Sequence, residues 1–229
     1  MVGLAILLLV AVTAVLAPVL APYDPLAMQG TEALLPPSLT HPFGTDQFGR
    51  DVFSRTLYGA RLSLPSGVIP VLFAFSCGVS LGLIAGYTGG WARAVIMRLA
   101  DILLGFPTLL LALFIVAMLG PAFTHVMLGV GISFVPHYIR LTYGSALAVQ
   151  EEAYILAARA LGSGPARIML RHIFPNILPS VIVLAALNVA WAILTGAALS
   201  YLGLGVQPPT PEWGMMVKEG SDYLRNYWW

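Results

Sequence analysis

The stretch QEEAYILAARALGSGPARIMLRHIFPN, at residues 150–176, is the most polar block in a chain that is dominated by long apolar runs. Its first half predicts a short helix with Glu151 and Glu152 in the first turn, where the helix dipole favours negative charge. Gly162 is expected to end this helix. The predicted helix interior is rich in alanine, the strongest helix former, at Ala153, Ala157, Ala158 and Ala160.

The second half of the stretch predicts another short helix. We expect Ser163 to cap it, Pro165 to stand in its first turn and Pro175 to end it. The basic residues of this helix are Arg167, Arg171 and His172. A helix pair that is small on one face and basic on another suits docking against a protein surface at the edge of a membrane. A pair that rests on lipid headgroups is an equal alternative.

The composition places most of the chain in lipid. Of its 229 residues, 59% are hydrophobic and 9% are charged, whereas soluble domains carry roughly 25% charged residues. A globular core of this length cannot bury so much apolar surface, so we expect an all-α integral membrane protein. The single cysteine, Cys77, excludes a disulfide framework, and no basic patch with interleaved aromatic residues points to nucleic acid.

Charge-free runs predict where the chain crosses the bilayer. Five spans are expected, at residues 2–21, 62–85, 102–119, 123–143 and 177–202. In the second span, the small residues Ser76, Gly78, Ser80 and Gly82 allow helices to pack closely. The run before Tyr23 lacks the basic head of a signal peptide, so we expect a retained span and a natural start that lies upstream.

A polar segment rich in proline and glycine separates the first two spans. We expect residues 1–61 to hold a membrane helix, a loop and a helix, GRDVFSRTLYGARLS, that lies flat at the interface. Asp46 is expected to cap that helix. Residues 62–229 are expected to form one transmembrane domain, in which a short loop at 87–98 joins the second and third spans.

Several long motifs resemble one known family. AARALGSGPARIMLRHIFPN is similar to the cytoplasmic EAA loop of binding-protein-dependent ABC importer permeases. The match to the dipeptide, oligopeptide and nickel branch rests on four further motifs, HPFGTDQFGRDVFSRTLYGARLS, AGYTGGW, MRLADILLGFP and LSYLGLGVQPPTPEWG. The resemblance covers nearly the whole chain. Within this branch, the chain resembles the second of the two permease subunits.

The resemblance implies the type I ABC importer fold and a division of labour. A second permease subunit would complete the pathway as a heterodimer, and an extracytoplasmic solute-binding protein would deliver the solute. Two ABC ATPase subunits would bind ATP and Mg, so this chain would carry no cofactor and no catalytic residue of its own. The implied location is the plasma membrane of a bacterium or archaeon, which puts residues 150–176 on the cytoplasmic side. The resemblance also implies that the loop within residues 1–61 is extracytoplasmic.

The resemblance also assigns a role to the polar loop. It implies a coupling helix that lies in a groove on the ATPase, with ATPase-coupling residues at Glu152, Ala157, Ala158, Gly162, Arg167, Arg171, His172 and Pro175. Two departures stand out. The family's acidic position is occupied by Leu156, and the family continues into a sixth span after the terminal aromatic cluster, whereas this chain stops at Trp229. The chain is then either a fragment or a departure from the family topology.

Polar residues within the spans are the remaining candidates. Asn188 and Thr195 are seven residues apart, on the same helical face, and either line a polar pathway or hold helices together. His125 and His137 have no Cys, Asp or Glu at a metal-ligand spacing, so we expect packing or interfacial histidines rather than a metal site.

Three functions compete at this stage. The first is a transport subunit for peptides or, within the same family, for nickel or another small solute. The second is an intramembrane enzyme with a histidine near Ser133, although no nucleophile motif, metalloprotease motif or phosphate-binding loop occurs. The third is a membrane scaffold that transports nothing.

Overall fold

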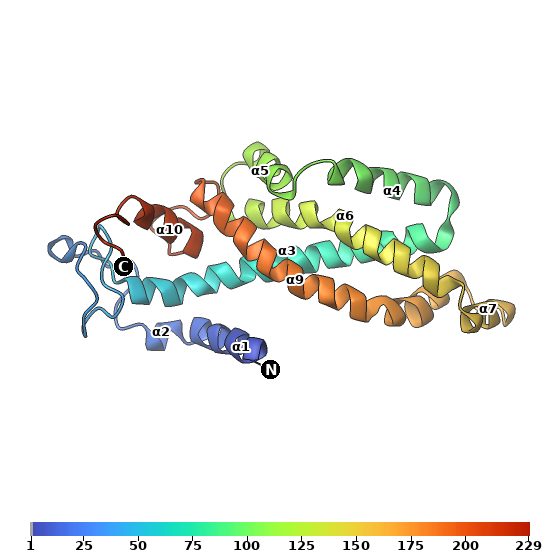
Figure 1. Cartoon of the computed structure of the whole chain (residues 1–229), viewed down its shortest axis with the longest axis horizontal. Helices are drawn as coiled ribbons and strands as arrows, with labels where there is room; N and C mark the ends of the chain where they lie inside the picture. Colours follow the sequence, from blue (N-terminus) through green and yellow to red (C-terminus); the bar gives the residue numbers. More distant parts are fainter. Residues whose placement is uncertain (1) are drawn as a thin grey trace. The chain divides into compact units, whose positions relative to one another are not determined.

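The computed structural model describes residues 2–229, and the side chains of all of these except Val2 and Leu4 (Figure 1). The described range is helical and holds no strand, apart from one isolated bridge between Thr45 and Asp51. The predicted all-α class is therefore confirmed.

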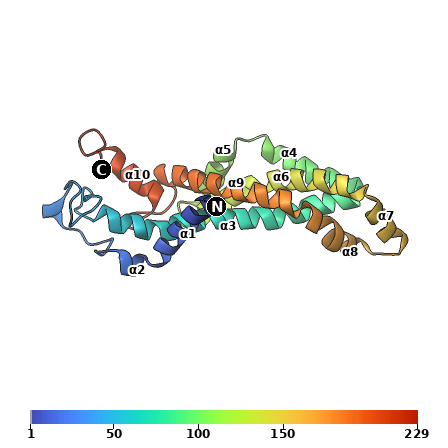
Figure 2. The ribbon, with the colours of Figure 1, turned by 60° about the horizontal axis from the view of Figure 1, so that its bottom comes forward.

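The elements are named here once, in chain order. They are α1 (Val2–Val15), α2 (Ala17–Leu20), η1 (Gly30–Glu32), α3 (Val52–Thr88), α4 (Gly90–Leu104), α5 (Thr108–Leu119), α6 (Phe123–Gln150), α7 (Ala153–Ala160), α8 (Pro165–Arg167), the π-helical η2 (Ile168–Ile173), α9 (Phe174–Tyr201) and α10 (Trp213–Ser221). In two views of the ribbon, α7 follows the C-terminal end of α6, and α8 leads toward α9 (Figure 2).

Two helices of the described range are long and apolar enough to cross a membrane by themselves. They are α3 and the continuous helix Pro165–Tyr201, which joins α8, η2 and α9. These helices contain the predicted spans 62–85 and, up to Tyr201, 177–202. The predicted spans 2–21 and 123–143 are helical, as α1 with α2 and as α6, without meeting the same criteria of length and hydropathy.

The third predicted span, 102–119, is not one straight helix. The chain bends by 93° between α4 and α5, and the pair counts as a third crossing only if the bent helices are taken together. Pro107 lies at this break, where it lacks the N–H that would continue the helix. The expected loop at 87–98 is wrong, because α4 begins at Gly90.

The expected interfacial helix is also not a separate element. Its residues form the first turns of α3, which runs without a break through residue 61. Asp46 does not cap this helix. Asp51 does, since its Oδ2 accepts the backbone N–H of Ser54 at 2.7 Å. The side chain of Asp46 instead accepts the backbone N–H groups of Phe48 and Arg50.

The chain forms two compact units. The first comprises residues 1–66, 116–126 and 193–229, and the second comprises residues 67–115 and 127–192. The first unit buries charged side chains together with apolar ones, among them Arg50, Arg55, Leu199 and Met215.

In the second unit, α3 and α6 pack through glycines spaced four residues apart. A Cβ added at Gly82 would lie 2.6 Å from the Cβ of Thr142, and one added at Gly86 would lie 2.8 Å from that of Ala146. At Gly78 the approach to Tyr138 is still closer. The close packing predicted for Gly78 and Gly82 is therefore confirmed, and it is the usual means by which membrane helices gain contact area. Ser76 and Ser80 are instead exposed, and their hydroxyls donate to carbonyls of α3 itself.

We predict that Gly78→Ala destabilises the protein, because its methyl group has no room against α6. Overpacking of this kind typically costs about 1–3 kcal/mol. Gly144→Ala is the matched control, since nothing lies within 4 Å of a Cβ there and alanine favours the helix. Thermal unfolding in detergent should show a lower Tm for the first variant only, and equal Tm values would contradict the packing.

Candidate functional site

The polar loop at residues 150–176 folds into α7, a tight turn, and then α8 with η2. α7 ends at a glycine in the left-handed region, because Gly162 has φ of +79°. The N–H of Ser163 donates to the carbonyl of Ala158 at 3.0 Å, and that of Gly162 donates to the carbonyl of Arg159 at 2.9 Å. This pair of bonds is the Schellman motif, so the prediction that Gly162 ends the first helix is confirmed.

Other local predictions for the loop are wrong. The first turn of α7 holds no acidic residue, because Glu152 is the N-cap and makes no side-chain capping bond. Gly164, not Ser163, is the N-cap of α8, although Pro165 does stand in the first turn.

Pro175 does not end the second helix, which continues into α9. A π-helical turn, Ile168–Ile173, immediately precedes α9. Its wider backbone gives room for a residue that lacks an N–H and whose ring crowds the preceding turn. The loop is therefore joined to a membrane-spanning helix without a flexible break.

The loop has an inner face and an outer face. Ile155, Ile168 and Ile173 are fully buried, and Ala158 is buried too, so apolar contacts hold α7 on η2. On the outer face, the apolar side chains of Leu156, Leu161 and Leu170 are 54%, 87% and 66% exposed.

The predicted coupling residues are mostly on this outer face. Ala158 is buried and His172 is half-buried, while the exposed ones are Glu152, Ala157, Gly162, Arg167, Arg171 and Pro175. The structure thus adds two exposed leucines, Leu161 and Leu170, to the outer face of the loop, and the sequence analysis did not predict them. The signal was present, because these leucines interrupt the polar loop where nothing in the sequence requires apolar residues.

Asn188 and Thr195 both lie half-buried on α9. The amide nitrogen of Asn188 is buried without a hydrogen-bond partner, as are the hydroxyl oxygens of Tyr138 and Thr142 on α6. Their part in a solute pathway stays a prediction.

The histidines make local contacts. Nδ1 of His125 lies 2.9 Å from the carbonyl oxygen of Gly120, and the His137 ring meets Phe134 edge to face with centroids 6.3 Å apart. Within residues 2–229, no group of three or more His, Cys, Asp or Glu side chains could hold a metal ion. These contacts agree with packing histidines.

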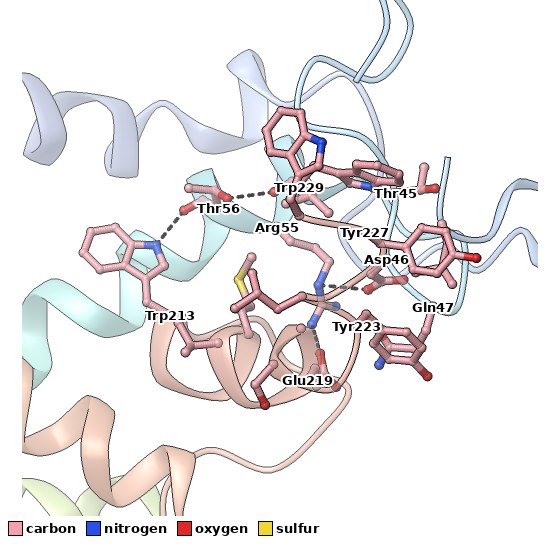
Figure 3. Close-up of a pocket in the computed structure, with 18 residues that line it drawn as sticks. Thr45, Asp46, Gln47, Arg55, Thr56, Trp213, Glu219, Tyr223, Tyr227 and Trp229 are labelled. Atoms are coloured by element: carbon pink, nitrogen blue, oxygen red, sulfur yellow. Dashed lines mark hydrogen bonds and ion pairs between the residues drawn. The ribbon is translucent and has the colours of Figure 1, made fainter. Parts of the chain in front are cut away.

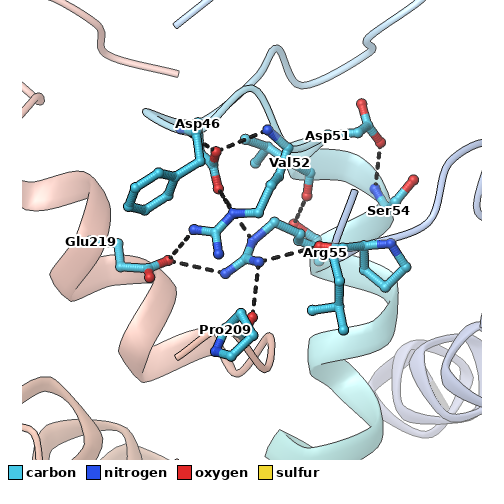
Figure 4. A network of polar contacts seen from close by, with 12 residues as sticks. Asp46, Asp51, Val52, Ser54, Arg55, Pro209 and Glu219 are labelled. Atoms are coloured by element: carbon cyan, nitrogen blue, oxygen red, sulfur yellow. Dashed lines mark hydrogen bonds and ion pairs between the residues drawn. The ribbon is translucent and has the colours of Figure 1, made fainter. Parts of the chain in front are cut away.

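A buried ion network lies in the first unit and was not predicted. Arg50 and Arg55 are each only 1% exposed, and both donate to the same oxygen, Oε2 of Glu219, at 3.0 Å (Figure 4). Oδ2 of Asp46 lies 2.6 Å from Nε of Arg50 and 3.5 Å from Nε of Arg55. Two cations therefore face two carboxylates, which compensates the charges where water is excluded.

The network ties distant segments of the first unit together. Arg55 also donates to the backbone carbonyls of Pro25 and Pro209, at 3.3 and 3.2 Å. Glu212 caps α10 by accepting the N–H groups of Gly214 and Met215, each at 3.0 Å. The unit is thus held by buried polar contacts as well as by apolar burial.

A cavity of about 530 Å³ opens beside the network. Trp213, Tyr223, Tyr227 and Trp229 line it together with the edge of the ion network, so its walls are aromatic with a charged margin (Figure 3). Nε1 of Trp213 donates to the backbone carbonyl of Thr56 at 3.1 Å, which fixes this wall on α3.

We predict that Glu219→Ala strongly destabilises the first unit. The substitution leaves Arg50 and Arg55 buried with one carboxylate between them, and breaking a buried ion pair typically costs about 3–5 kcal/mol. Asp222→Ala is the control, because this acidic residue is exposed three positions along the same segment. Unfolding in detergent should separate the two variants, and an unchanged Tm for Glu219→Ala would refute the role of the network.

Comparison with known proteins adds to this geometry. Residues 78–227 match the family described as "Binding-protein-dependent transport system inner membrane component". Residues 1–37 match the "N-terminal TM domain of oligopeptide transport permease C".

Similar proteins cover nearly the whole chain. The chain is 43% identical to the di/tripeptide transport system permease protein DppC of Pseudomonas aeruginosa, over 99% of this chain and 77% of that protein. It is 42% identical to the probable D,D-dipeptide transport system permease protein DdpC of Escherichia coli, over 98% and 75%. It is 43% identical to the glutathione transport system permease protein GsiD of Pectobacterium atrosepticum, over 95% and 72%. The chain therefore belongs to the family of binding-protein-dependent transport system inner membrane components.

Proposed function

We propose that this chain is one of two permease subunits of an ATP-driven importer for di- or oligopeptides. The relatives at 42–43% identity carry the names of dipeptide, D,D-dipeptide and glutathione transporters, all peptide-like solutes. In this proposal the chain forms half of the pathway and hydrolyses nothing. Two partner ATPases bind ATP and Mg, and an extracytoplasmic binding protein delivers the peptide at a bacterial plasma membrane.

The observation that carries the mechanism is the two-sided loop at residues 150–176. Its inner face is fastened by fully buried isoleucines, whereas its outer face presents leucines that are more than half exposed. Burial of apolar area contributes about 25 cal/mol per Å², so docking of this outer face on a protein partner would be favourable. We propose that this partner is the ATPase.

The charges of the outer face fit the same partner. Arg167 and Arg171 are exposed and can meet acidic side chains or the carbonyl groups of a groove. Leu156 stands where the family has an acidic residue, and its exposed side chain joins the apolar surface. This departure adds docking area in place of a polar contact.

The loop continues without interruption into α9, and we propose that this continuity transmits movement of the loop to the membrane-spanning helix. The helix Pro165–Tyr201 is 37 residues long and has no loop within it. A push on the loop can therefore move a membrane-spanning helix as a rigid body.

Polar atoms within the spans suit a pathway. In hydrocarbon, an amide or hydroxyl without a partner is costly, and such groups usually mark a functional site. We propose that Asn188 and Thr195 line the route of the peptide, whose backbone carbonyls can accept a hydrogen bond from the buried amide nitrogen of Asn188.

We predict that Leu161→Glu uncouples ATP hydrolysis from peptide uptake. The side chain is 87% exposed, so the change costs the fold little, but a carboxylate would be desolvated in a docked apolar groove. Uptake should fall about tenfold or more, whereas Leu161→Met should retain it. Gly162→Trp is a less clean test, because any side chain is strained at its φ of +79°. If the Leu161→Glu variant assembles normally and takes up peptide in proteoliposomes at the rate of the wild type, the hypothesis that this surface docks on the ATPase is wrong.

A further inference from the structure

The outer part of the loop is joined to two other helices through a chain of polar contacts. Nη2 of Arg159, in the last turn of α7, donates to Oε1 of Gln150 at 3.0 Å. Nε2 of Gln150 donates in turn to the carbonyl oxygens of Gly86 at 2.8 Å and Ala146 at 3.3 Å. The Arg159 guanidinium also lies over the ring of Tyr87, 5.2 Å from its centroid.

The contacts join the ends of α3, α6 and α7, and α3 is distant in sequence from the other two. Gly86 and Tyr87 belong to the last turn of α3, and Gln150 is the last residue of α6. The carbonyl of Gly86 is one of the last four of α3, which have no partner within the helix. The Gln150 amide satisfies it, and the Arg159 cation stands near the negative ends of the helix dipoles.

These bonds differ in kind from the packing that holds the inner face of α7. Apolar contacts are non-directional, so the buried Ile155 holds α7 against η2 without fixing by itself the orientation of α7 relative to α3 and α6. Hydrogen bonds weaken steeply when their angle or length changes, so they hold two elements in register. A lever that must move helices in both directions needs directional contacts such as these hydrogen bonds.

We infer that Arg159 and Gln150 form a relay that carries movement of α7 to the ends of α3 and α6. Arg159 acts as a positioning residue for coupling, with Gln150 as its intermediate and Tyr87 as the platform for its cation. The inference rests on the proposed function, because it assigns the route by which an ATPase stroke reaches helices other than α9.

The test uses the complete transporter, reconstituted in proteoliposomes with a dipeptide as solute. Uptake and ATP hydrolysis are measured on the same sample, and their ratio is compared between variants. Arg159→Met keeps an apolar stem and loses the donor. We expect it to assemble normally and hydrolyse ATP within about twofold of wild type, while peptide taken up per ATP falls about tenfold, the scale of one charge-assisted hydrogen bond.

Further variants test the individual contacts of the relay one at a time. Gln150→Glu keeps an acceptor for Arg159 but loses the donor to the Gly86 carbonyl, so we expect the same loss of coupling. Arg159→Lys keeps a cationic donor and should recover coupling to within about threefold. Tyr87→Phe keeps the aromatic face beneath the cation and should match wild type.

Three outcomes would overturn the relay. An unchanged ratio in Arg159→Met would do so, as would a wild-type ratio in Gln150→Glu. A parallel fall of uptake and hydrolysis in both variants would show a merely structural role. Absence of ATP-driven, binding-protein-dependent uptake by the wild type would instead refute the proposed function, and the relay with it.

Discussion

The structure depends on one constraint: in hydrocarbon, every backbone polar group must find its partner within the protein. The chain meets it with helices throughout its apolar runs and confines loops to the segments rich in proline, glycine and charge. Close packing of α3 on α6 follows from the same constraint, since membrane helices gain little from burying apolar surface and more from contact area. The polar stretch at residues 150–176 therefore has to lie where the membrane ends.

Charged residues are used in two different ways. In the first unit, Arg50 and Arg55 are buried and paired with Glu219 and Asp46, so their charges stabilise contacts within the unit. In the loop, Arg167 and Arg171 are exposed. Exposed charges and leucines that make no contact needed for folding are suited to binding a partner. Buried, fully paired charges are suited to stabilising the fold.

Local rules predicted some features of the loop and missed others, whereas the buried ion network depends on contacts distant in sequence. Gly162 and Pro165 follow from turn and cap chemistry, and both predictions are confirmed. Pro175 was expected to end a helix, but a π-helical turn accommodates it, which no local pattern signals. Arg50 was expected at the interface, and its burial depends on Glu219, 169 residues away. The membrane class and the family were predictable because composition and long motifs carry them. The outer leucines interrupt a polar loop in the sequence, but only their exposure in the structure assigns them to its outer face.

We propose that residues 150–176 form a cytoplasmic lever driven by a separate ATPase. The most direct measurement is photocrosslinking in intact cells from an amino acid inserted at Ala166, an exposed position of α8. The account predicts a covalent adduct between this chain and an ATPase subunit. Adducts confined to lipid or to proteins on the extracytoplasmic side would contradict it.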